Sequence, residues 1–347
     1  AAKPRFDGEW VKLNQLCTKG RSALRQKDLT NDGPYAVYGA SGIVGSMPTF
    51  QNDIRYVAVV KDGAGVGRAS LCSANTSVLG TMQALIPVEE VSPEYLLHLI
   101  RAMRLGDGFS GSTIPHIYFK DYGQRLVRRV SMVDQGHIVD TLGSIERQMD
   151  IARGQLTKLD DFVKSRFAEM FENDSLVERA QLKDICSLIT DGTHQSPRFQ
   201  GEGIPFLFVS NIADNKISYE TTKFISKEDY EALIARTPIE VGDVLMSAVG
   251  SFGHPAIVKD ERPFCFQRHI AYLKPIRERV NSSFLHAALL SEESQQYMDK
   301  AAKGAAQRTV TLRSFKDLAV PLPPLALQQE FADFAAEVDK SRFVVRN

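Results

Sequence analysis

The chain has 347 residues, and a single hydrophobic core rarely grows to this length, so two domains are expected. The formal net charge is zero, which argues against a free-standing protein that binds polyanions without selectivity, because such proteins neutralise many phosphates with lysine and arginine. With 43% hydrophobic and 24% charged residues, no apolar run near the roughly eighteen of a membrane span and no signal-peptide pattern, the sequence predicts a soluble, cytoplasmic protein.

The start of the first half of the chain recurs in the second half. Val11–Cys17 returns as Ala180–Cys186, with leucine, leucine or isoleucine, and cysteine at matching positions. A sequence repeat of this kind indicates that the same structural unit occurs twice. This match marks the starts of two domains.

Further matches follow in the same order and predict strands. Val59–Gly67 is answered by Val244–Gly253, in each case a strand, a turn with glycine and a second strand. One residue is inserted in the second copy. Met82–Pro87 corresponds to Ile270–Pro275, which predicts a strand that ends at proline.

Helical stretches and a last match complete the repeat. The predicted helices are Pro93–Met103 and Ser282–Tyr297, and the last match pairs Thr113–Asp121 with Thr309–Asp317, each ending in Phe-Lys-Asp. Five matches in one order are not expected by chance. We therefore predict an α+β protein with two homologous domains of mixed β-sheet and helices, residues 1–130 and 179–322, the repeat itself beginning at about residue 8.

Two segments outside the repeat, residues 131–178 and 323–347, predict long helices. Apolar residues follow a 4-3-4-3 spacing in both, with Arg166 and Ser341 as polar exceptions. The first stripe comprises Ile138, Leu142, Ile145, Met149, Ala152, Leu156, Leu159, Val163, Arg166 and Met170. The second comprises Leu327, Phe331, Phe334, Val338, Ser341 and Val345. Both helices also carry Gln-x-x-apolar-x-Asp, beginning at Gln135 and at Gln328.

A narrow apolar stripe is not buried by one helix alone, so the two helices most simply pack on each other, antiparallel if the domains lie at opposite ends. The first would then be a rigid spacer about 58 Å long at about 1.5 Å per residue. The second stripe stops in mid-pattern at Asn347 and is about half as long. Either the helix continues beyond this residue in the whole protein, or a partner completes the stripe.

No residue pattern indicates catalysis, a metal site or a bound cofactor. Gly63-x-Gly65-x-Gly67 lacks the acidic residue that follows a dinucleotide loop by about twenty positions, and there is no P-loop. The Asn/Asp-Pro-Pro-aromatic motif of base methylation is also missing. The cysteines have no CxxC spacing or adjacent histidine pair, which predicts small buried side chains rather than disulfides or a zinc site. They are Cys17, Cys72, Cys186 and Cys265.

Several segments together resemble the specificity (S) subunits of Type I restriction-modification systems, over nearly the whole chain. In the second domain these are Asp191–Pro197 (DGTHQSP), Gly203–Phe206, Gly242–Ser247, Gln267–Ile270, and Val320–Pro324 leading to Gln328 and Gln329. In the first domain, Tyr35–Gly42 is similar to the family's alternative opening.

The resemblance implies two target recognition domains that alternate with two conserved helical regions, each domain reading one half of a split, asymmetric DNA site. It implies two methyltransferase (modification) subunits docked on the helices, and restriction subunits that complete an endonuclease. S-adenosylmethionine and ATP would bind those partners, so this chain would be non-catalytic and would hold no cofactor or metal.

Candidate DNA-binding residues are polar or basic side chains in the predicted loops, which can donate to phosphates and to base edges. In the second domain they are Thr193, His194, Arg198, Arg268, His269, Gln307, Arg308, Thr309, Arg313 and Lys316. In the first they are Ser41, Lys61, Arg68, His116 and Lys120. Alternatives stay open: His194 as a structural turn residue, Arg268 and His269 as a buried hydrogen-bonding pair, and the basic stretch Lys300–Lys316 as a solvated face.

Two other functions also remain open. The chain could be the specificity subunit of a two-component restriction system, in which one partner both methylates and cuts. It could instead be a coiled-coil scaffold whose domains bind protein rather than nucleic acid. The identity of the co-purifying partner would decide between the first alternative and a Type I subunit. Base-specific methylation that depends on residues 8–130 would exclude the second alternative.

Overall fold

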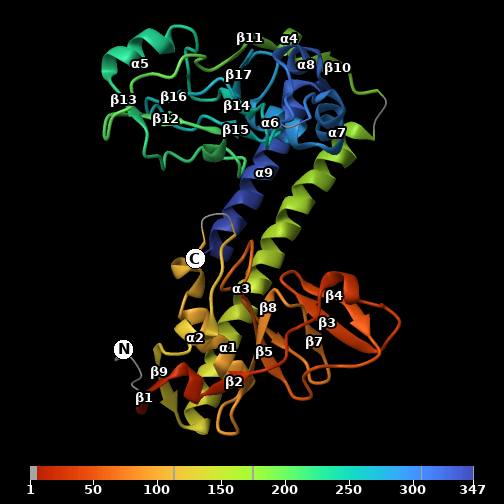
Figure 1. Ribbon diagram of the computed structural model, residues 1–347. Coiled ribbons are helices and arrows are strands. Elements are labelled where there is room, and N and C mark those ends of the chain that lie inside the picture. The colour runs from red at the N-terminus through yellow and green to blue at the C-terminus, as the bar shows by residue number, and fades with distance from the viewer. Residues whose placement is uncertain (1–5, 112–113, 174–175, 306, 347) are drawn as a thin grey trace. The chain divides into compact units, whose positions relative to one another are not determined.

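The structure is a computed structural model that describes residues 6–111, 114–173, 176–305 and 307–346, with side chains described up to residue 342 (Figure 1). Contacts within the chain divide it into unit 1, residues 1–150, and unit 2, residues 151–347. The dividing point lies inside the long helix α3 (Met132–Phe167). Each unit is described by itself.

The described residues of unit 1, 6–111 and 114–150, form three sheets. The largest has the strand order β2-β8-β5-β6 with antiparallel neighbours, and the others are β4-β3-β7 and β1-β9. Its strands are β1 (Gly8–Lys12), β2 (Cys17–Lys19), β3 (Tyr35–Gly39), β4 (Gly42–Met47), β5 (Tyr56–Val60), β6 (Ala69–Cys72), β7 (Ser77–Val78), β8 (Met82–Pro87) and β9 (Leu126–Val130).

The central strand β5 explains how the core of unit 1 is arranged. All five of its residues are buried, and successive side chains point to opposite faces of the sheet. Val57 and Val59 pack with helix α1 (Pro93–Ala102), while Tyr56, Ala58 and Val60 pack in a second apolar cluster on the other face. The four-stranded sheet is therefore covered on both sides.

The helices of unit 1 begin where the sequence offers capping groups. Ser92 caps α1 by accepting a hydrogen bond from Tyr95 N, and proline occupies the first turn, where its missing N–H costs nothing. The remaining helical segments are η1 (Leu13–Gln15), η2 (Gln26–Asp28), η3 (Leu105–Gly108), α2 (Phe119–Tyr122) and α3, which continues into a π-helical turn, η4 (Ala168–Glu172).

Unit 2 has sheets of the same kind, with the orders β11-β17-β14-β15, β13-β12-β16 and β10-β18. Its strands are β10 (Arg179–Gln181), β11 (Cys186–Asp191), β12 (Ile204–Leu207), β13 (Phe224–Ile225), β14 (Val244–Ser247), β15 (Pro255–Ile257), β16 (Cys265–Phe266), β17 (Ile270–Pro275) and β18 (Ala319–Pro321). Its helical segments are α4 (Leu182–Ile185), η5 (Val209–Asn211), α5 (Lys227–Ile234), α6 (Ser282–Leu290), α7 (Glu292–Ala301), α8 (Leu312–Asp317) and α9 (Leu325–Arg346).

The strand orders of the two units correspond strand by strand. In each three-stranded sheet the middle strand pairs antiparallel with one neighbour and parallel with the other, β3 with β4 and β7, and β12 with β13 and β16. The sequence matches fall on equivalent elements, since Met82–Pro87 is β8 and Ile270–Pro275 is β17. The predicted α+β class is confirmed.

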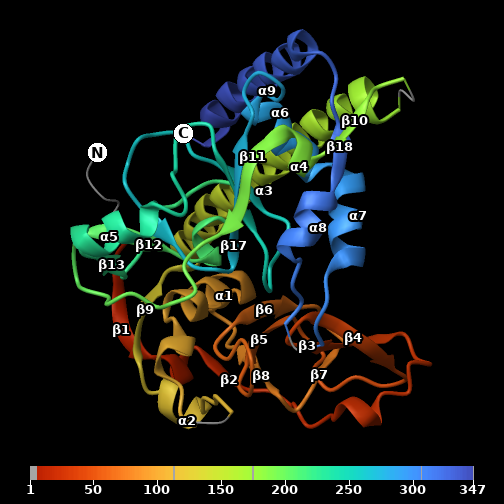
Figure 2. The same cartoon turned by 90° about the horizontal axis from the view of Figure 1, so that it is seen from above.

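The helical stretch predicted at Ser282–Tyr297 consists of two helices, α6 and α7, that meet at Ser291. Ser291 is extended (φ −61°, ψ 154°), and its side chain accepts a hydrogen bond from Ser294 N and so begins α7. A serine that competes for the backbone in this way favours a new helix start over continuation. Helices α7 and α8 lie side by side (Figure 2).

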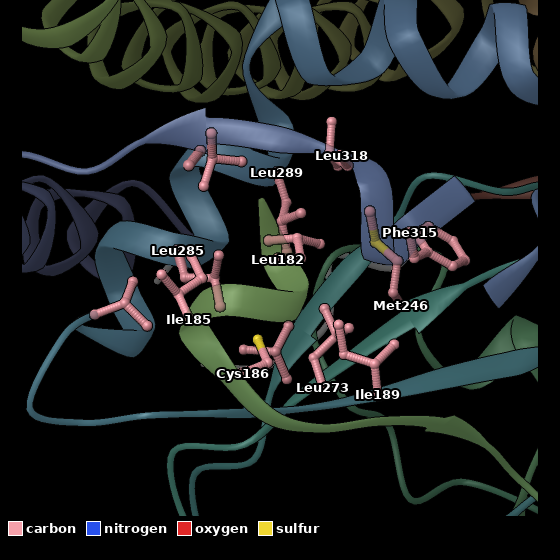
Figure 3. Close-up of a cluster of buried hydrophobic side chains, with 14 of the residues drawn as sticks. Leu182, Ile185, Cys186, Ile189, Met246, Leu273, Leu285, Leu289, Phe315 and Leu318 are labelled. Atoms are coloured by element: carbon pink, nitrogen blue, oxygen red, sulfur yellow. The ribbon is translucent and has the colours of Figure 1, made fainter. Parts of the chain in front are cut away.

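The main core of unit 2 lies between its four-stranded sheet and helices α4, α6 and α8. Figure 3 shows side chains from these elements, among them Leu182, Met246 and Leu285, gathered in this cluster. Phe167 and Phe171 at the end of α3 join the same cluster and contact Phe331 of α9, with ring centroids 5.3 and 5.8 Å apart.

Within unit 2, the last turns of α3 pack against α9. Asp160 pairs with Arg342 at 2.5 Å and the rings of Phe162 and Phe334 are 5.2 Å apart, so later residues of α3 meet earlier residues of α9. The two segments therefore run in opposite directions.

The predicted stripe residues differ in their surroundings. Ile138 packs on the core of unit 1, and Val163, Phe331 and Phe334 belong to the core of unit 2. The buried Val338 and the partly buried Leu156 and Leu159 lie further along the helices. Leu142, Ile145, Met149 and Leu327 are 37, 47, 48 and 42% exposed. The side chain of Val345 lies outside the described residues.

Candidate nucleic-acid interface

In unit 2, one end of the four-stranded sheet gathers most of the candidate loops. Adjacent strands are antiparallel, so the ends of β11 and β14 lie at the same edge as the starts of β15 and β17. We call this edge, with the segment that pairs to it, the loop end of unit 2; it comprises residues 192–194, 248–254, 266–269, 303–305 and 307–310.

Backbone hydrogen bonds join these segments. Thr193 N donates to Phe266 O at 3.1 Å, and Arg268 N donates to Thr193 O at 3.0 Å. Ala248 N donates to His269 O at 2.9 Å. The last segment is attached through the bond from Gly250 N to Arg308 O and the bond from Val310 N to Ala248 O, both 2.9 Å.

The equivalent edge of unit 1, which we call the loop end of unit 1, comprises residues 61–68, 79–82, 110–111 and 114–117. Lys61 N donates to Thr81 O, Ile117 N donates to Lys61 O, and Gly63 N donates to Pro115 O, each at 2.9 Å. His116 forms bridges with both Asp62 and Ser110.

The bonding pattern matches residue by residue between the units. Lys61 occupies the place of Ala248, and His116 that of Thr309, which forms bridges with Val249 and Lys303. The predicted match of Thr113 with Thr309 therefore needs correction. Thr113 itself lies outside the described residues, and the residue of unit 1 whose backbone bonds are equivalent to those of Thr309 is His116.

The structure brings Thr193, His194, Arg268, His269, Gln307, Arg308 and Thr309 to the loop end of unit 2. His194 Nε2 lies 2.9 Å from Asp191 Oδ2, so only the other ring nitrogen remains to meet a base or phosphate. Arg268 and Gln307 are exposed. Burial, with a smaller contribution from the charge of Arg268, lowers the pKa of His269, so its ring favours the neutral form that can both donate and accept.

Arg308 differs from the other candidates, because its guanidinium is engaged within the protein. Nη1 lies 2.7 Å from Asp299 Oδ1, Nη2 donates to Asp299 O, and the guanidinium lies 5.2 Å from the ring centre of Phe252. These contacts hold Arg308 against Asp299 of α7 and against Phe252. We therefore assign Arg308 a positioning role.

Three candidates of the second domain lie outside the hydrogen-bonded loop end. Arg198 adjoins Phe199, whose ring packs on Phe206 of β12 at 5.2 Å. Arg313 and Lys316 are exposed on α8, which ends beside α4 at the opposite end of the sheet, where Leu182 N donates to Leu318 O. Arg313 lies 3.8 Å from Asp317 on the same helix.

In unit 1 the candidates Lys61, Arg68 and His116 lie at the loop end, and the other two lie beside it. Arg68 folds over its own turn, with contacts of 3.4 Å to the carbonyls of Ala64 and Gly65. Lys120 lies 5.3 Å from the ring centre of Tyr118. Ser41 is at the exposed tip of the β3–β4 hairpin.

Comparison with known proteins bears on the second half of the chain first. The sequence profile of the family described as "Type I restriction modification DNA specificity domain" matches residues 175–343. This segment belongs to that family. The resemblance drawn from the sequence is thereby confirmed for residues 175–343, which lie in unit 2.

Relatives and solved structures extend the likeness. The chain is 23% identical over 252 residues to the Type I restriction enzyme EcoBI specificity subunit of Escherichia coli, covering 64% of this chain and 53% of that protein. It is 22% identical over 272 residues to the MjaVIII specificity subunit of Methanocaldococcus jannaschii, covering 70% and 63%. The matches thus span between about half and under two thirds of these relatives.

Two solved structures share the fold. The S subunit of a Type I restriction-modification system from M. genitalium superposes with a TM-score of 0.57 at 15% identity, covering 100% of this chain and 93% of that one. A chain from a structural study of complex assembly in the Type I system gives a TM-score of 0.51 at 18% identity, covering 99% and 93%.

Sequence reasoning missed polar residues at the loop end of the specificity domain. His254 lies 3.1 Å from both Ser251 Oγ and Asn215 Oδ1, and Ser251 is exposed. Gln267 forms a bridge with Thr193. In unit 1, Tyr118 is exposed and its ring centre is 4.9 Å from that of His116. For Ser251 and His254 the available signal was the adjacent turn glycines, Gly250 and Gly253.

The glycine-rich segment of unit 1 is a turn between strands. Gly63, Gly65 and Gly67 have φ of +86°, +88° and +84°, and the segment leads into strand β6 rather than into a helix whose N–H groups could hold a phosphate. A Cβ at Gly67 would lie 2.2 Å from Gly106 N, so glycine is required here by close backbone contact.

The four cysteines are all buried and unpaired, as the sequence predicts. Among residues 6–111, 114–173, 176–305 and 307–346, no three His, Cys, Asp or Glu side chains are grouped as a metal site. Within the part of the chain that the structure describes, no helix is both long and apolar enough to cross a membrane.

Proposed function

We propose that this chain is the DNA sequence-recognition subunit of a Type I restriction-modification complex, in which each unit reads one half of a bipartite site. The observation that carries the proposal is the same backbone network at the loop ends of both units, with different side chains on it. Two domains that read different half-sites would need the same backbone arrangement with different hydrogen-bonding side chains on it. Major-groove base edges offer distinct donor and acceptor patterns for such side chains.

The recognition domains would be residues 1–130 and 179–322, separated by the helical regions 131–178 and 323–347. The antiparallel contacts of α3 with α9 in unit 2 support a coiled coil between these regions. Such a pair would fix the gap between half-sites.

The proposed partners are double-stranded DNA, two methyltransferase subunits and restriction subunits, met in the cytoplasm and not at a membrane. The partners would bind S-adenosylmethionine and ATP and would carry out catalysis. The neutral net charge supports this division, because methyltransferase subunits would then supply much of the phosphate contact. The isolated chain should bind DNA weakly.

A domain exchange tests the proposal. Residues 8–130 are replaced by the corresponding domain of another specificity subunit, and methylation of genomic DNA is mapped in cells that contain the methyltransferase partner. One half of the methylated motif should change while the other half stays. Methylation that is unaltered, or that never depends on this chain, would contradict the proposal and favour a protein-binding scaffold.

A further inference from the structure

A buried glutamine lies near the start of α3. Gln135 is only 1% exposed, and its side-chain amide forms three hydrogen bonds. Oε1 accepts from Ser92 N at 2.9 Å, while Nε2 donates to Glu90 O at 2.9 Å and to Val130 O at 3.1 Å. All three partners are backbone groups of the domain that packs on this helix.

The same arrangement occurs at the start of α9. Gln328 is 0% exposed, and its Oε1 accepts from Asn281 N at 2.8 Å. Its Nε2 donates to Arg279 O at 3.0 Å and to Pro323 O at 2.8 Å. In both units Oε1 accepts from the backbone N of the residue that caps α1 or α6. Nε2 donates to two carbonyls, one of the residue two positions before that cap and one of the residue five positions before the glutamine.

These bonds connect three segments in each unit. They are the loop that begins α1 or α6, the chain at the end of β9 or just after the end of β18, and the long helix itself. Buried backbone N–H and C=O groups need partners, and leaving one without a partner costs far more than a surface hydrogen bond contributes. In each unit the glutamine side chain satisfies all three groups at once.

An apolar residue three positions after each glutamine strengthens the attachment. Ile138 packs on the core of unit 1, and Phe331 is buried in the core of unit 2. Residues three apart lie on one helix face, so the polar and apolar contacts act on the same side of each long helix. Together they attach each long helix to its unit by one face.

We propose that Gln135 and Gln328 are positioning residues that fix the angle between each recognition domain and its long helix, and thereby set the gap between DNA half-sites. The statement about DNA rests on the proposed function. The statement about the angle does not, and the two are measured separately.

The angle is tested by distance measurements between pairs of spin labels. One pair, at Asp53→Cys and Asp140→Cys, reports on unit 1, and another, at Glu261→Cys and Glu330→Cys, reports on unit 2. Gln135→Met keeps the side-chain length but removes all three hydrogen bonds. It should at least double the width of the distance distribution in unit 1 and leave unit 2 unchanged, and Gln328→Met should do the reverse.

A matched control and a milder variant complete this experiment. Gln148→Met changes an exposed glutamine of α3 and should alter neither distribution. If Gln135→Met does not fold, Gln135→Glu retains the acceptor for Ser92 N, and protonation of the carboxyl restores one donor. Burial beside the carbonyls of Glu90 and Val130 should raise the pKa of this carboxyl, so more of it is protonated at pH 5.5 than at pH 8. Its distance distribution should therefore be narrower at pH 5.5. The proposal would be overturned if Gln135→Met, or Gln135→Glu at pH 8 in its place, and Gln328→Met fold and give distance distributions as narrow as those of the wild type.

The consequence for DNA is tested with the methyltransferase complex. Substrates carry the two half-sites with the natural gap, or with a gap one base pair shorter or longer. The double variant Gln135→Met, Gln328→Met should raise the methylation of altered gaps relative to the natural gap at least threefold, with unchanged half-site sequences. Unchanged gap selectivity despite broadened distances would overturn the DNA part alone. A wild-type complex that methylates no bipartite site would count against the proposed function and not against the fixed angle.

Discussion

The candidate DNA-binding residues separate by what their side chains contact. Arg268 is exposed on a loop held by backbone bonds, whereas Arg308 is paired with Asp299 and lies over Phe252. Sequence alone predicts both as DNA contacts, because a basic residue in a loop shows no sign of its spatial partner. The pairing of residues nine positions apart depends on how α7 and the following turn fold.

This difference gives a prediction about Arg268. Its replacement by alanine should cost about 1–3 kcal/mol in recognition, roughly a 5- to 150-fold loss of methylation, and should relax selectivity at one base pair. Arg308→Ala should instead lower the thermal unfolding temperature and weaken all sites equally. Methylation rates on a panel of single-base variants distinguish the two. A uniform loss in Arg268→Ala would indicate a phosphate contact.

The buried thiols give a second prediction at this scale. Burial raises the pKa of Cys17, Cys186 and Cys265 to about 12 and that of Cys72 to about 11, so the reactive thiolate is scarce at neutral pH. A thiol reagent such as DTNB should modify none of them in the folded protein at pH 8 and all four in denaturant. Rapid modification of any one in the native state would show that its cluster opens readily.

His286 predicts how stability depends on pH. Its Nε2 lies 3.1 Å from Pro255 O and 3.3 Å from Asn215 O, and burial, more than any neighbouring charge, lowers the pKa of its ring below the ordinary 6.5. The neutral ring is favoured in the folded protein, so stability is full above about pH 6.5 and declines as the pH falls below it. His286→Gln should show a smaller decrease in unfolding temperature between pH 7.5 and 5.5 than the wild type.

The exposed His137 on α3 provides the matched control for that measurement. His137→Gln should retain the wild-type pH dependence. Equal behaviour of the two variants would mean that other groups cause the acid sensitivity.

At the scale of elements, the sequence predicts the parts that carry a strong local signal. The repeat places β8 and β17 correctly because each ends at proline, and apolar spacing locates α3 and α9. The small parallel pairs of β3 with β7 and β12 with β16 are two residues long and show no periodicity, so only tertiary contacts reveal them. The tripeptide Phe-Lys-Asp begins α2 but ends α8, three residues further into the helix, and this offset displaced the match of Thr113.

The attachment of α9 to unit 2 yields a stability prediction. Phe331 is fully buried among Phe167, Phe171 and Phe284, so Phe331→Ala should lower the free energy of unfolding by about 3–5 kcal/mol through lost contacts and a cavity. Leu327→Ala, one turn earlier and 42% exposed, should cost less than about 1 kcal/mol. Urea unfolding followed by circular dichroism measures both. Similar losses would mean that Phe331 lies outside the cooperative core.

At the scale of the whole molecule, the proposed separation of two readers by helices can be measured on DNA. One heptad adds about 10.5 Å to a helix, which is about three base pairs at roughly 3.4 Å each. Adding seven residues to both α3 and α9 should therefore lengthen the unspecified gap of the methylated motif by about three base pairs. Methylation mapping reads the gap directly, and an unchanged gap would refute the role of the helices as a spacer.

Within each loop end, the segments are joined by hydrogen bonds between main-chain atoms. These atoms belong to Lys61 and Gly63 in unit 1 and to Ala248 and Gly250 in unit 2. Side chains at these positions can therefore change without loss of the frame that presents them. If the chain reads DNA as proposed, a few exchanges in the loops would give a new target sequence while the fold stays constant. On this arrangement, the sequence specificity of the proposed DNA reader could evolve faster than its fold.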